Sequence, residues 1–285
     1  MKSLDNDSKG RPLDQIEGPW RSFDAAVAWP RDAMGVHHGE LSADWLQGRT
    51  GFGGLSAAIA LQAALAELPI PLPLRSFDIA FLAPMTPGDG TARAVILRAG
   101  RAVTWVEATI EQNGEEVLRA LAVFGPARPS SVAYAPTPIS PRKRLDDAPP
   151  IPYVEGVVPR FVRHFDILWG EGLPPFSASP EPITGGWVRH REQATGLPAL
   201  LGLIDAWPAP VLPTLSAPAP ASTVRWTVQP LSDVGSSVDG TNWHHFRSET
   251  IAAGDGFATV VGTLSDAAGQ PLVFSEQLVA VFDRT

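Results

Sequence analysis

The chain contains no cysteine among its 285 residues. Disulfide bonds and thiolate catalysis are therefore excluded, and the composition fits a reducing compartment. A long apolar run is also missing, because the longest one, residues 55–68, is interrupted by Ser56, Gln62 and Glu67 and is too short to span a membrane. Residues 1–7 are polar and lack the apolar core of a signal peptide. We therefore expect a cytoplasmic protein with no membrane partner.

Positive charge is scarce. The chain has 22 basic and 30 acidic residues, which gives a net charge of −8. The densest basic cluster is Arg142-Lys143-Arg144, and its proline-rich surroundings are typical of a solvated linker. Such a chain cannot neutralise many phosphates, so we expect no nucleic-acid partner. A small anionic ligand is still compatible with local arginines.

Signatures of metal and cofactor binding are also missing. No two of the six histidines stand four residues apart with an acidic neighbour, so we expect no metal site. The turn at residues 51–56 approaches the dinucleotide fingerprint, but Ser56 stands where the third glycine belongs and no βαβ pattern follows. We therefore read this turn as the start of a helix, and expect no cofactor.

Prolines are abundant, and they divide the chain. The 29 prolines gather at 126–152, 171–182 and 208–220, between the patterned segments. Proline fixes φ and lacks an N–H donor, so these stretches are predicted to be loops. The organisation predicted from this pattern is a polar N-terminal tail (1–20), a first repeat (21–126), a proline-rich linker (127–160) and a second repeat (161–285).

The two predicted repeats share one plan. A glycine-rich turn opens an apolar helix at residues 53–68, and a second one opens a helix at residues 196–207. Counting on from Gly54 and from Gly196 equates Ala63 with Asp205, the one carboxylate on the second helix. This difference between the two copies marks Asp205 as the leading candidate for a functional site.

Strand patterns surround both helices. Asn113-Gly114 is a strong two-residue hairpin signal, and Asp266 to Gly269 is the corresponding turn of the second copy. The predicted strands lie at 23–29, 34–46, 74–82, 90–99, 102–113 and 116–124 in the first copy, and at 163–168, 187–191, 222–228, 243–251, 256–265 and 271–282 in the second. Two equivalent α+β halves can pair their sheets edge to edge, with both helices on the same side, which covers two exposed edges.

A long helix wrapped by an antiparallel sheet, present twice in one chain, resembles the double hot-dog fold. Within that group the sequence looks like the acyl-CoA thioesterase II family and its thioesterase-like relatives. The stretches that carry the likeness are Phe52-Gly53-Gly54 with its Ala-rich helix, Phe81-Leu82-Ala83-Pro84, Gly100-Arg101, Gln112-Asn113-Gly114, and Gly269 to Gln277. The resemblance implies a role in lipid metabolism, as a hydrolase that splits acyl-CoA into free acid and CoA.

The resemblance also implies a catalytic group of Asp, Thr and Gln in the second repeat, which holds and activates water. The matching positions are Asp205 on the helix, Thr223 where the first long strand begins, and Gln277, eight residues after Gly269. Thr223 is followed by Val224-Arg225-Trp226-Thr227, whereas relatives usually carry an Asp-His-type pair and a Trp-Phe-His run. Ser222 therefore stays a rival for the Thr position, and the departure suggests an altered substrate pocket.

The chemistry of thioester hydrolysis fits these residue types. A carboxylate on an apolar helix suits a general base, because burial raises its pKa. Thr and Gln can orient a water molecule, but cannot act as bases at neutral pH. The oxyanion donor is expected to be a backbone N–H at a helix N-terminus, with Gly54 and Leu55 as candidates. Gly53, Gly54 and Leu55 are together assigned to substrate binding.

Other interpretations stay open at this point. Asp205 could simply bond the turn that follows it. A non-catalytic protein that binds acyl thioesters could use the same scaffold. A hydratase or dehydratase is disfavoured, because that chemistry usually pairs an Asp with a nearby His and residues 206–210 supply none. This architecture commonly pairs further, so we expect a homo-oligomer, as a dimer or a higher form.

Overall fold

Antiparallel strands dominate the computed structural model, which describes residues 20–231, 234 and 238–283. The strands of its main sheet are β1 (His37–Leu41), β4 (Leu74–Phe81), β5 (Gly88–Ala99), β6 (Thr104–Gln112), β7 (Glu115–Phe124), β8 (Phe165–Gly172), β9 (Ile183–His190), β10 (Ala221–Pro230), β11 (His244–Gly254), β12 (Phe257–Ser265) and β13 (Pro271–Val281). Of the predicted N-terminal tail, residues 1–20, all but Trp20 lie outside the described residues.

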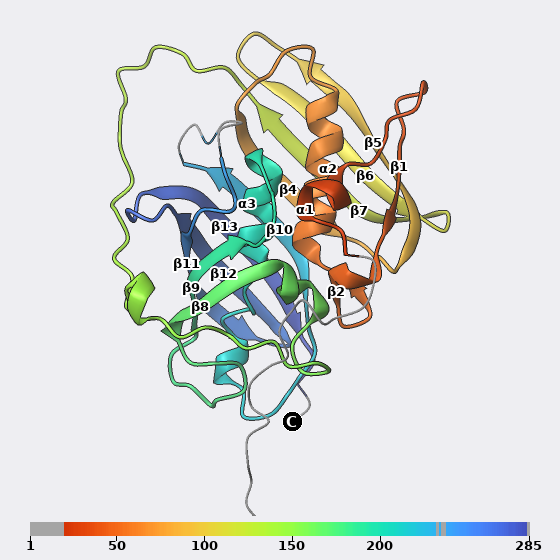
Figure 1. Cartoon of the computed structure of the whole chain (residues 1–285). Coiled ribbons are helices and arrows are strands. Elements are labelled where there is room, and N and C mark those ends of the chain that lie inside the picture. Colours follow the sequence, from red (N-terminus) through yellow and green to blue (C-terminus); the bar gives the residue numbers. More distant parts are fainter. Residues whose placement is uncertain (1–19, 232–233, 235–237, 284–285) are drawn as a thin grey trace, which may run out of the picture.

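One continuous sheet joins the two repeats. Within the described ranges its eleven strands lie in the order β1-β5-β6-β7-β4-β10-β13-β12-β11-β9-β8 (Figure 1). The junction is the antiparallel pair of β4 and β10, in which Phe77 lies opposite Val228 and Ala80 opposite Arg225. The predicted edge-to-edge pairing of two half-sheets is therefore confirmed.

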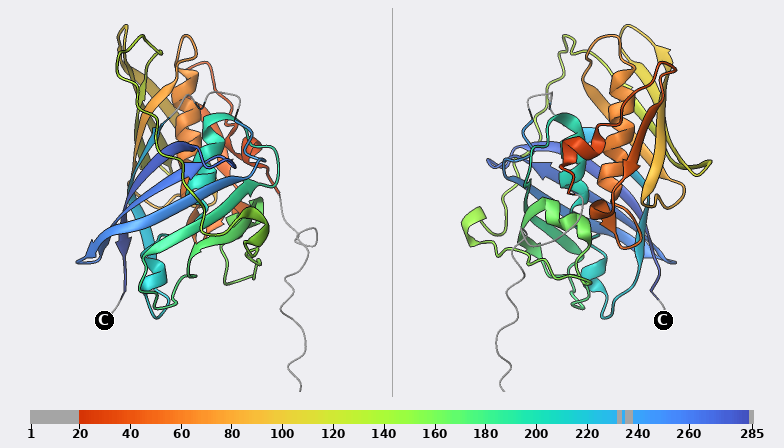
Figure 2. Two further views of the ribbon diagram at one scale, coloured as in Figure 1. Left: turned by 90° about the vertical axis from the view of Figure 1, so that its left-hand side faces the viewer. Right: turned by 45° about the vertical axis from the view of Figure 1, so that its right-hand side comes forward.

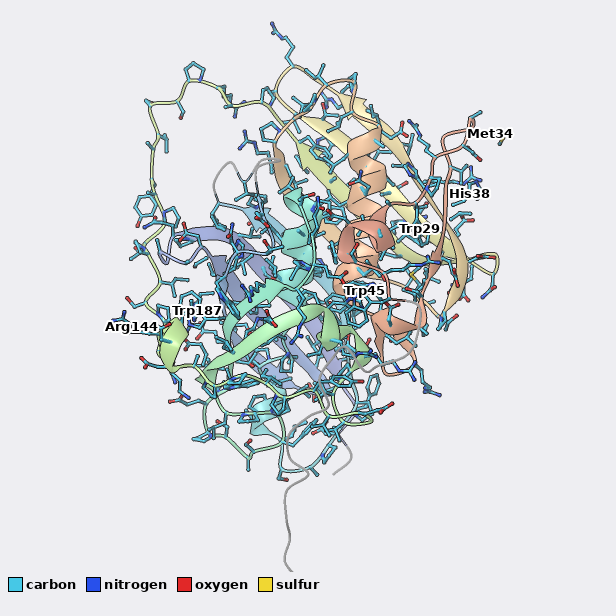
Figure 3. The ribbon with its side chains drawn as sticks, in the orientation of Figure 1. Trp29, Met34, His38, Trp45, Arg144 and Trp187 are labelled. Atoms are coloured by element: carbon cyan, nitrogen blue, oxygen red, sulfur yellow. The ribbon has the colours of Figure 1, made fainter. Side chains whose placement is uncertain are left out.

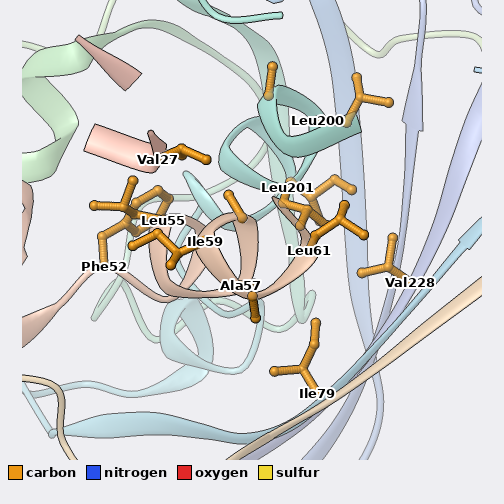
Figure 4. Close-up of a cluster of buried hydrophobic side chains, with 14 of the residues drawn as sticks. Val27, Phe52, Leu55, Ala57, Ile59, Leu61, Ile79, Leu200, Leu201 and Val228 are labelled. Carbon is orange, nitrogen blue, oxygen red and sulfur yellow. The ribbon is translucent and has the colours of Figure 1, made fainter. Parts of the chain in front are cut away.

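Two long helices, α2 (Gly53–Ala66) and α3 (Gly196–Asp205), pack against each other on the same side of this sheet (Figures 1 and 2). Apolar residues cover most faces of α2, and its side chains from Gly54 to Ala64 are buried apart from Gln62. Prolines soon follow both helices and end them. The core between helices and sheet is labelled in Figure 4: Val27, Phe52, Leu55, Ala57, Ile59, Leu61, Ile79, Leu200, Leu201 and Val228.

The predicted strand at residues 23–29 is wrong, because Phe23–Val27 forms a short helix, α1. The Oγ of Ser22 caps it by accepting a hydrogen bond from the N–H of Ala25 at 3.4 Å. Phe23, Ala26 and Val27 are buried, which is the i, i+3, i+4 spacing of a helix face. The segment is so short and apolar that its pattern fits both a strand and a helix. Its packing against α2 and α3 therefore decides its structure.

The predicted strand at residues 34–46 is too long. Only His37–Leu41 pairs with the main sheet, as β1. A single 3₁₀ turn, Ala43–Trp45, follows, and then a separate two-stranded ribbon of β2 (Leu46–Gln47) and β3 (Thr50–Gly51). This ribbon leads directly into α2, and it places Phe52 and Gly53 at the start of that helix.

The predicted hairpin turn at Asn113-Gly114 is confirmed. Both residues adopt positive φ, 55° and 79°, as a two-residue turn between β6 and β7 requires. Asp266 to Gly269 joins β12 to β13 in the same place of the second repeat. None of the helices in the described ranges has both the length and the apolar character needed to cross a membrane.

The segment between β7 and β8 lies against the second repeat. The buried carboxylate of Glu171 accepts a hydrogen bond from the backbone N–H of Arg142 at 2.9 Å, and the Nε2 of His245 lies 3.2 Å from it. Trp187, close to Arg144 in Figure 3, donates its Nε1–H to the carbonyl of Lys143 at 3.0 Å. These contacts fasten the segment to β8 and β9, and His245 joins Glu171 to β11.

Candidate functional site

The carboxylate of Asp205 lies where the two long helices meet. Asp205 is the last residue of α3, and its Oδ2 accepts a hydrogen bond of 2.7 Å from the backbone N–H of Gly54 in the first turn of α2. Its Oδ1 accepts a longer bond, 3.2 Å, from the Nε2 of Gln277 on β13. Its partners therefore come from both repeats.

The ends of the two helices act on this carboxylate in opposite directions. The N-terminus of α2 carries a partial positive charge and unpaired N–H groups, which favour an anion. The C-terminus of α3 carries a partial negative charge, which disfavours one. Asp205 is part of the C-terminus of α3, which disfavours its negative charge. Its hydrogen bond with Gly54 places the carboxylate at the N-terminus of α2, which favours that charge.

Burial controls the protonation of this group. Removal from water raises the pKa of Asp205 from 3.8 to about 7, although the hydrogen bonds from Gly54 and Gln277 lower it in part. A carboxyl group with a pKa near neutrality can exchange a proton at physiological pH, which is the property that a general base needs.

The position of Thr223 depends on a β-bulge in β10. Pairing with β13 shifts register between Thr223 and Arg225, so Val224 is the extra residue. Without the bulge, alternation would place Thr223 on the opposite face from Trp226. With it, Thr223 lies opposite the buried Val279, and its Oγ donates to the Oε1 of Gln277 at 3.3 Å. Its rival Ser222 is exposed and lies opposite Ala280.

The three predicted catalytic side chains therefore form one directed chain of hydrogen bonds. Thr223 donates to the carbonyl oxygen of Gln277, whose amide N–H donates to Asp205. The N–H···O distance of 3.2 Å lies at the long end of the normal range, and the O–H···O distance of 3.3 Å lies slightly beyond it. A network with loose bonds can open to accept a water molecule between its members.

The three predicted substrate-binding residues differ in which N–H groups are free. The N–H of Gly54 is used by Asp205, and that of Leu55 donates to the carbonyl of Phe52 at 3.2 Å. Both amides are therefore already hydrogen-bonded in this structure, and their assignment to substrate binding stays a prediction. Within the described residues, the N–H of Gly53 has no acceptor, as expected for the first residue of a helix.

Gly53 also leaves the space in which the carboxylate lies. A Cβ atom at this position would meet the Oδ2 of Asp205 at 2.8 Å and the ring of Phe81 at 3.5 Å. Phe81, the last residue of β4, is a member of the site that sequence reasoning missed. Its motif, Phe81-Leu82-Ala83-Pro84, was a possible signal, but nothing in the sequence shows that the ring comes close to Asp205.

The first repeat has no equivalent polar network. β4 carries the same bulge, with a register shift between Leu74 and Ser76, which makes Leu74 the counterpart of Thr223. Ala122 lies opposite Phe77 as Gln277 lies opposite Trp226, and Ala63 corresponds to Asp205. All three counterparts, Leu74, Ala122 and Ala63, are buried and apolar. In the part of the chain that the structure describes, this polar network therefore occurs once.

Replacing Asp205 by Asn should stabilise the fold in a pH-dependent way. Folding raises this pKa from 3.8 to about 7. Ionisation of Asp205 therefore lowers the free energy of unfolding as pH rises from about 4 to about 7, and the full loss is present above pH 7. We expect Asp205→Asn to raise the free energy of unfolding at pH 8 by up to about 4 kcal/mol, and to change it little at pH 4. Urea unfolding at both values measures this, and an equal effect at both would contradict the raised pKa.

Comparison with known families follows the same two-part division. The family described as "Acyl-CoA thioesterase N-terminal domain" matches residues 41–125, and "Acyl-CoA thioesterase C-terminal domain" matches residues 145–281. A search of curated proteins found no match.

Solved structures of similar proteins share the fold over nearly their whole length. A hot-dog protein of unknown function from Alicyclobacillus acidocaldarius is 26% identical, with a TM-score of 0.80, and the match covers 92% of this chain and 98% of that one. A candidate thioesterase II from Thermobifida fusca YX is 23% identical, with a TM-score of 0.78 and coverage of 93% and 99%. The acyl-CoA thioesterase II TesB2 from Mycobacterium marinum is 15% identical, with a TM-score of 0.72 and coverage of 93% and 99%.

Both halves of the fold thus match the two domains of one family, in the same order and over most of the chain. The double hot-dog architecture predicted from the sequence is confirmed by the sheet order and by these structures. The chain belongs to the acyl-CoA thioesterase family.

Proposed function

We propose that this thioesterase hydrolyses acyl-CoA to a free acid and CoA, with Asp205 as the general base. The observation that carries the proposal is the placement of the Asp205 carboxylate, between the Gln277 amide and the first turn of α2. Family membership supports thioester hydrolysis. The acyl-CoA substrate is inferred from the family and from the fit of the site residues to this chemistry.

In the proposed reaction, a water molecule is held by Thr223 and Gln277 and gives a proton to Asp205 as its oxygen attacks the thioester carbonyl carbon. The new C–O bond converts the carbonyl into a tetrahedral oxyanion. Collapse of this intermediate breaks the C–S bond, and the proton on Asp205 passes to the leaving thiolate. The pKa of about 7 suits both halves of this transfer.

The developing oxyanion needs a donor that the resting structure does not already use. The N–H of Gly53 meets this condition, and it lies at the positive end of α2. Its missing side chain also leaves the approach to Asp205 open. We therefore assign the oxyanion contact to Gly53, in place of Gly54 and Leu55.

The pH profile of hydrolysis tests the base directly. Because Asp205 acts in its ionised form, kcat/KM should rise about tenfold for each pH unit up to about 7 and then level off. Asp205→Asn should lose about 10²- to 10⁴-fold in rate and lose this pH dependence. Release of free thiol from a panel of acyl-CoAs measures both, and the absence of cysteine in the protein keeps the background low.

Turnover of Asp205→Asn at the wild-type rate would remove Asp205 from the mechanism. If the wild-type chain bound acyl-CoA but released no thiol from short, long or aromatic acyl groups, the chain would instead be a non-catalytic binder of acyl thioesters.

Gly53→Ala tests the approach to the carboxylate. The added Cβ would lie 2.8 Å from the Oδ2 of Asp205, so one of the two must move, and we expect kcat to fall at least about tenfold. Gly254→Ala is the matched control, because a Cβ there meets no atom within 4 Å. Equal activity in the two variants would show that the placement of this carboxylate does not limit the rate.

Thr223 and Gln277 should behave as one unit. If both hold the same water molecule, Thr223→Ala and Gln277→Ala should each lower kcat, and the double variant should lose much less than the product of the two losses. Thr223→Ser keeps the hydroxyl group and should retain most activity, and so should Ser222→Ala, which removes the exposed neighbour. Fully multiplicative losses would mean that the two residues act separately.

A further inference from the structure

A second apolar cluster lies beside the site and is separate from the main core. We call it the Val211 cluster; its buried members are Val211, Ala258, Val260, Val279 and Val281, and Ala209, Leu212, Leu215 and Ala221 pack against it partly buried. All nine side chains are aliphatic, with no aromatic or polar member. The main core, in contrast, is rich in Phe and Trp.

The cluster adjoins two of the proposed catalytic residues. Val260 on β12 lies directly opposite Gln277, and Val279 lies two residues beyond Gln277 on the same face of β13. Val279 is also the residue opposite Thr223. From Gln277 to Val281 the strand extends for about 13 Å. An apolar surface of that length therefore begins at the proposed water-binding residues.

The cover of this cluster is a proline-rich loop whose backbone hydrogen bond toward the sheet, within the described residues, is at its end, where the carbonyl of Pro220 accepts from the N–H of Phe282 at 2.9 Å. Residues 206–220 join α3 to β10, so the loop begins next to Asp205 and ends close to Thr223. Its backbone carbonyls at Leu212, Pro213 and Leu215 accept hydrogen bonds from the loop at residues 173–182. Among the described residues, no backbone hydrogen bond joins residues 206–219 to β10, β12 or β13.

Because of this bonding pattern, the loop can move away from the strands beneath the Val211 cluster without breaking its hydrogen bonds to the neighbouring loop. The two loops hold each other, and over the Val211 cluster loop and sheet meet through aliphatic side chains. Trp207, at the start of the loop, packs instead on Trp169 of β8, outside the cluster. Such contacts are non-directional, so an inserted aliphatic chain can replace them without leaving a backbone polar group unpaired. A slot can therefore open between loop and sheet at low cost.

The first repeat lacks this arrangement. Its connection from α2 to β4 covers only residues 67–73. The bulky, fully buried Phe124 lies opposite Leu74, where the second repeat has Val279 opposite Thr223. The smaller side chains and the longer loop thus occur only in the repeat that carries the polar network.

We propose that the Val211 cluster is the acyl-chain site of this thioesterase, and that Val211 and Val281, at the far end from Gln277, set the length of the saturated aliphatic chain it accepts. The proposal rests on the proposed function. The thioester carbonyl lies at Thr223, Gln277 and Asp205, and the acyl chain extends from there between the loop and strands β12 and β13. Aromatic or charged acyl groups find no matching partner in this wall.

The chain-length profile tests the proposal. Acetyl-, hexanoyl-, dodecanoyl- and palmitoyl-CoA are compared by kcat/KM for the wild type, Val211→Phe, Val281→Ala and a control. Val211→Phe fills the slot from the loop side, and should lower the dodecanoyl-to-acetyl ratio about tenfold or more. Val281→Ala lengthens the slot at its far end, and should raise the palmitoyl-to-dodecanoyl ratio about fourfold.

Val228→Ala is the matched control, because Val228 is equally buried but belongs to the main core. It should change stability without changing either ratio. Equilibrium binding of dodecanoic acid to the same variants gives a second readout that needs no turnover, and Val211→Phe should weaken it about tenfold.

Unchanged ratios and unchanged binding in both slot variants would overturn the proposal while leaving hydrolysis of acyl-CoA established. No thiol release by the wild type would overturn the proposed function, and the binding arm would then still decide whether the aliphatic site exists. A shift of the ratios in Val228→Ala as large as in the slot variants would also overturn the proposal, since the effect would then reflect general loosening.

Discussion

The hydrogen bond between the carboxylate of Asp205 and the N–H of Gly54 is the contact on which the rest of the site depends. It joins residues that are 151 positions apart and lie in different repeats. The carboxylate comes from the end of one helix and its electrostatic support from the start of another, so neither repeat could form the group alone. The packing of α2 on α3, and the pairing of β4 with β10, bring these ends together.

The same contact explains how a charged side chain is held in an apolar interior. Burial disfavours the anion, whereas the start of α2 favours it, and burial is the stronger effect. A fully compensated carboxylate would keep a low pKa and be a poor base. An uncompensated one would stay protonated. The balance between the two leaves a group that titrates near neutral pH, and the fold gives up some stability to keep it there.

Much of the fold could be predicted from the sequence, because each long element has a clear pattern. The Asn113-Gly114 turn, the apolar helices and the alternation of the strands are local properties. The comparison of Ala63 with Asp205 pointed to the helix end at which Gly54 and Gln277 bind the carboxylate. The helix at Phe23–Val27 could not be predicted, because its short apolar segment fits two periods and tertiary contacts choose between them. The bulge that turns Thr223 toward the helices could not be predicted either, because no residue type at this position is specific for a bulge. Which N–H of the first turn of α2 is left free depends on which one Asp205 binds, and that is set by tertiary packing.

The fastening of residues 139–151 to the second repeat has a consequence for how the two halves find each other. This segment is bonded to Glu171, Trp187 and the turn at Gly269, so it acts as a short tether and not as a free strand. A tether turns the meeting of the halves into an intramolecular event with a high effective concentration. The pairing of α2 with α3 is therefore insensitive to dilution. The polar residues can then reside in one half alone, with Ala63, Leu74 and Ala122 at the matching positions of the other, because the two halves are always joined.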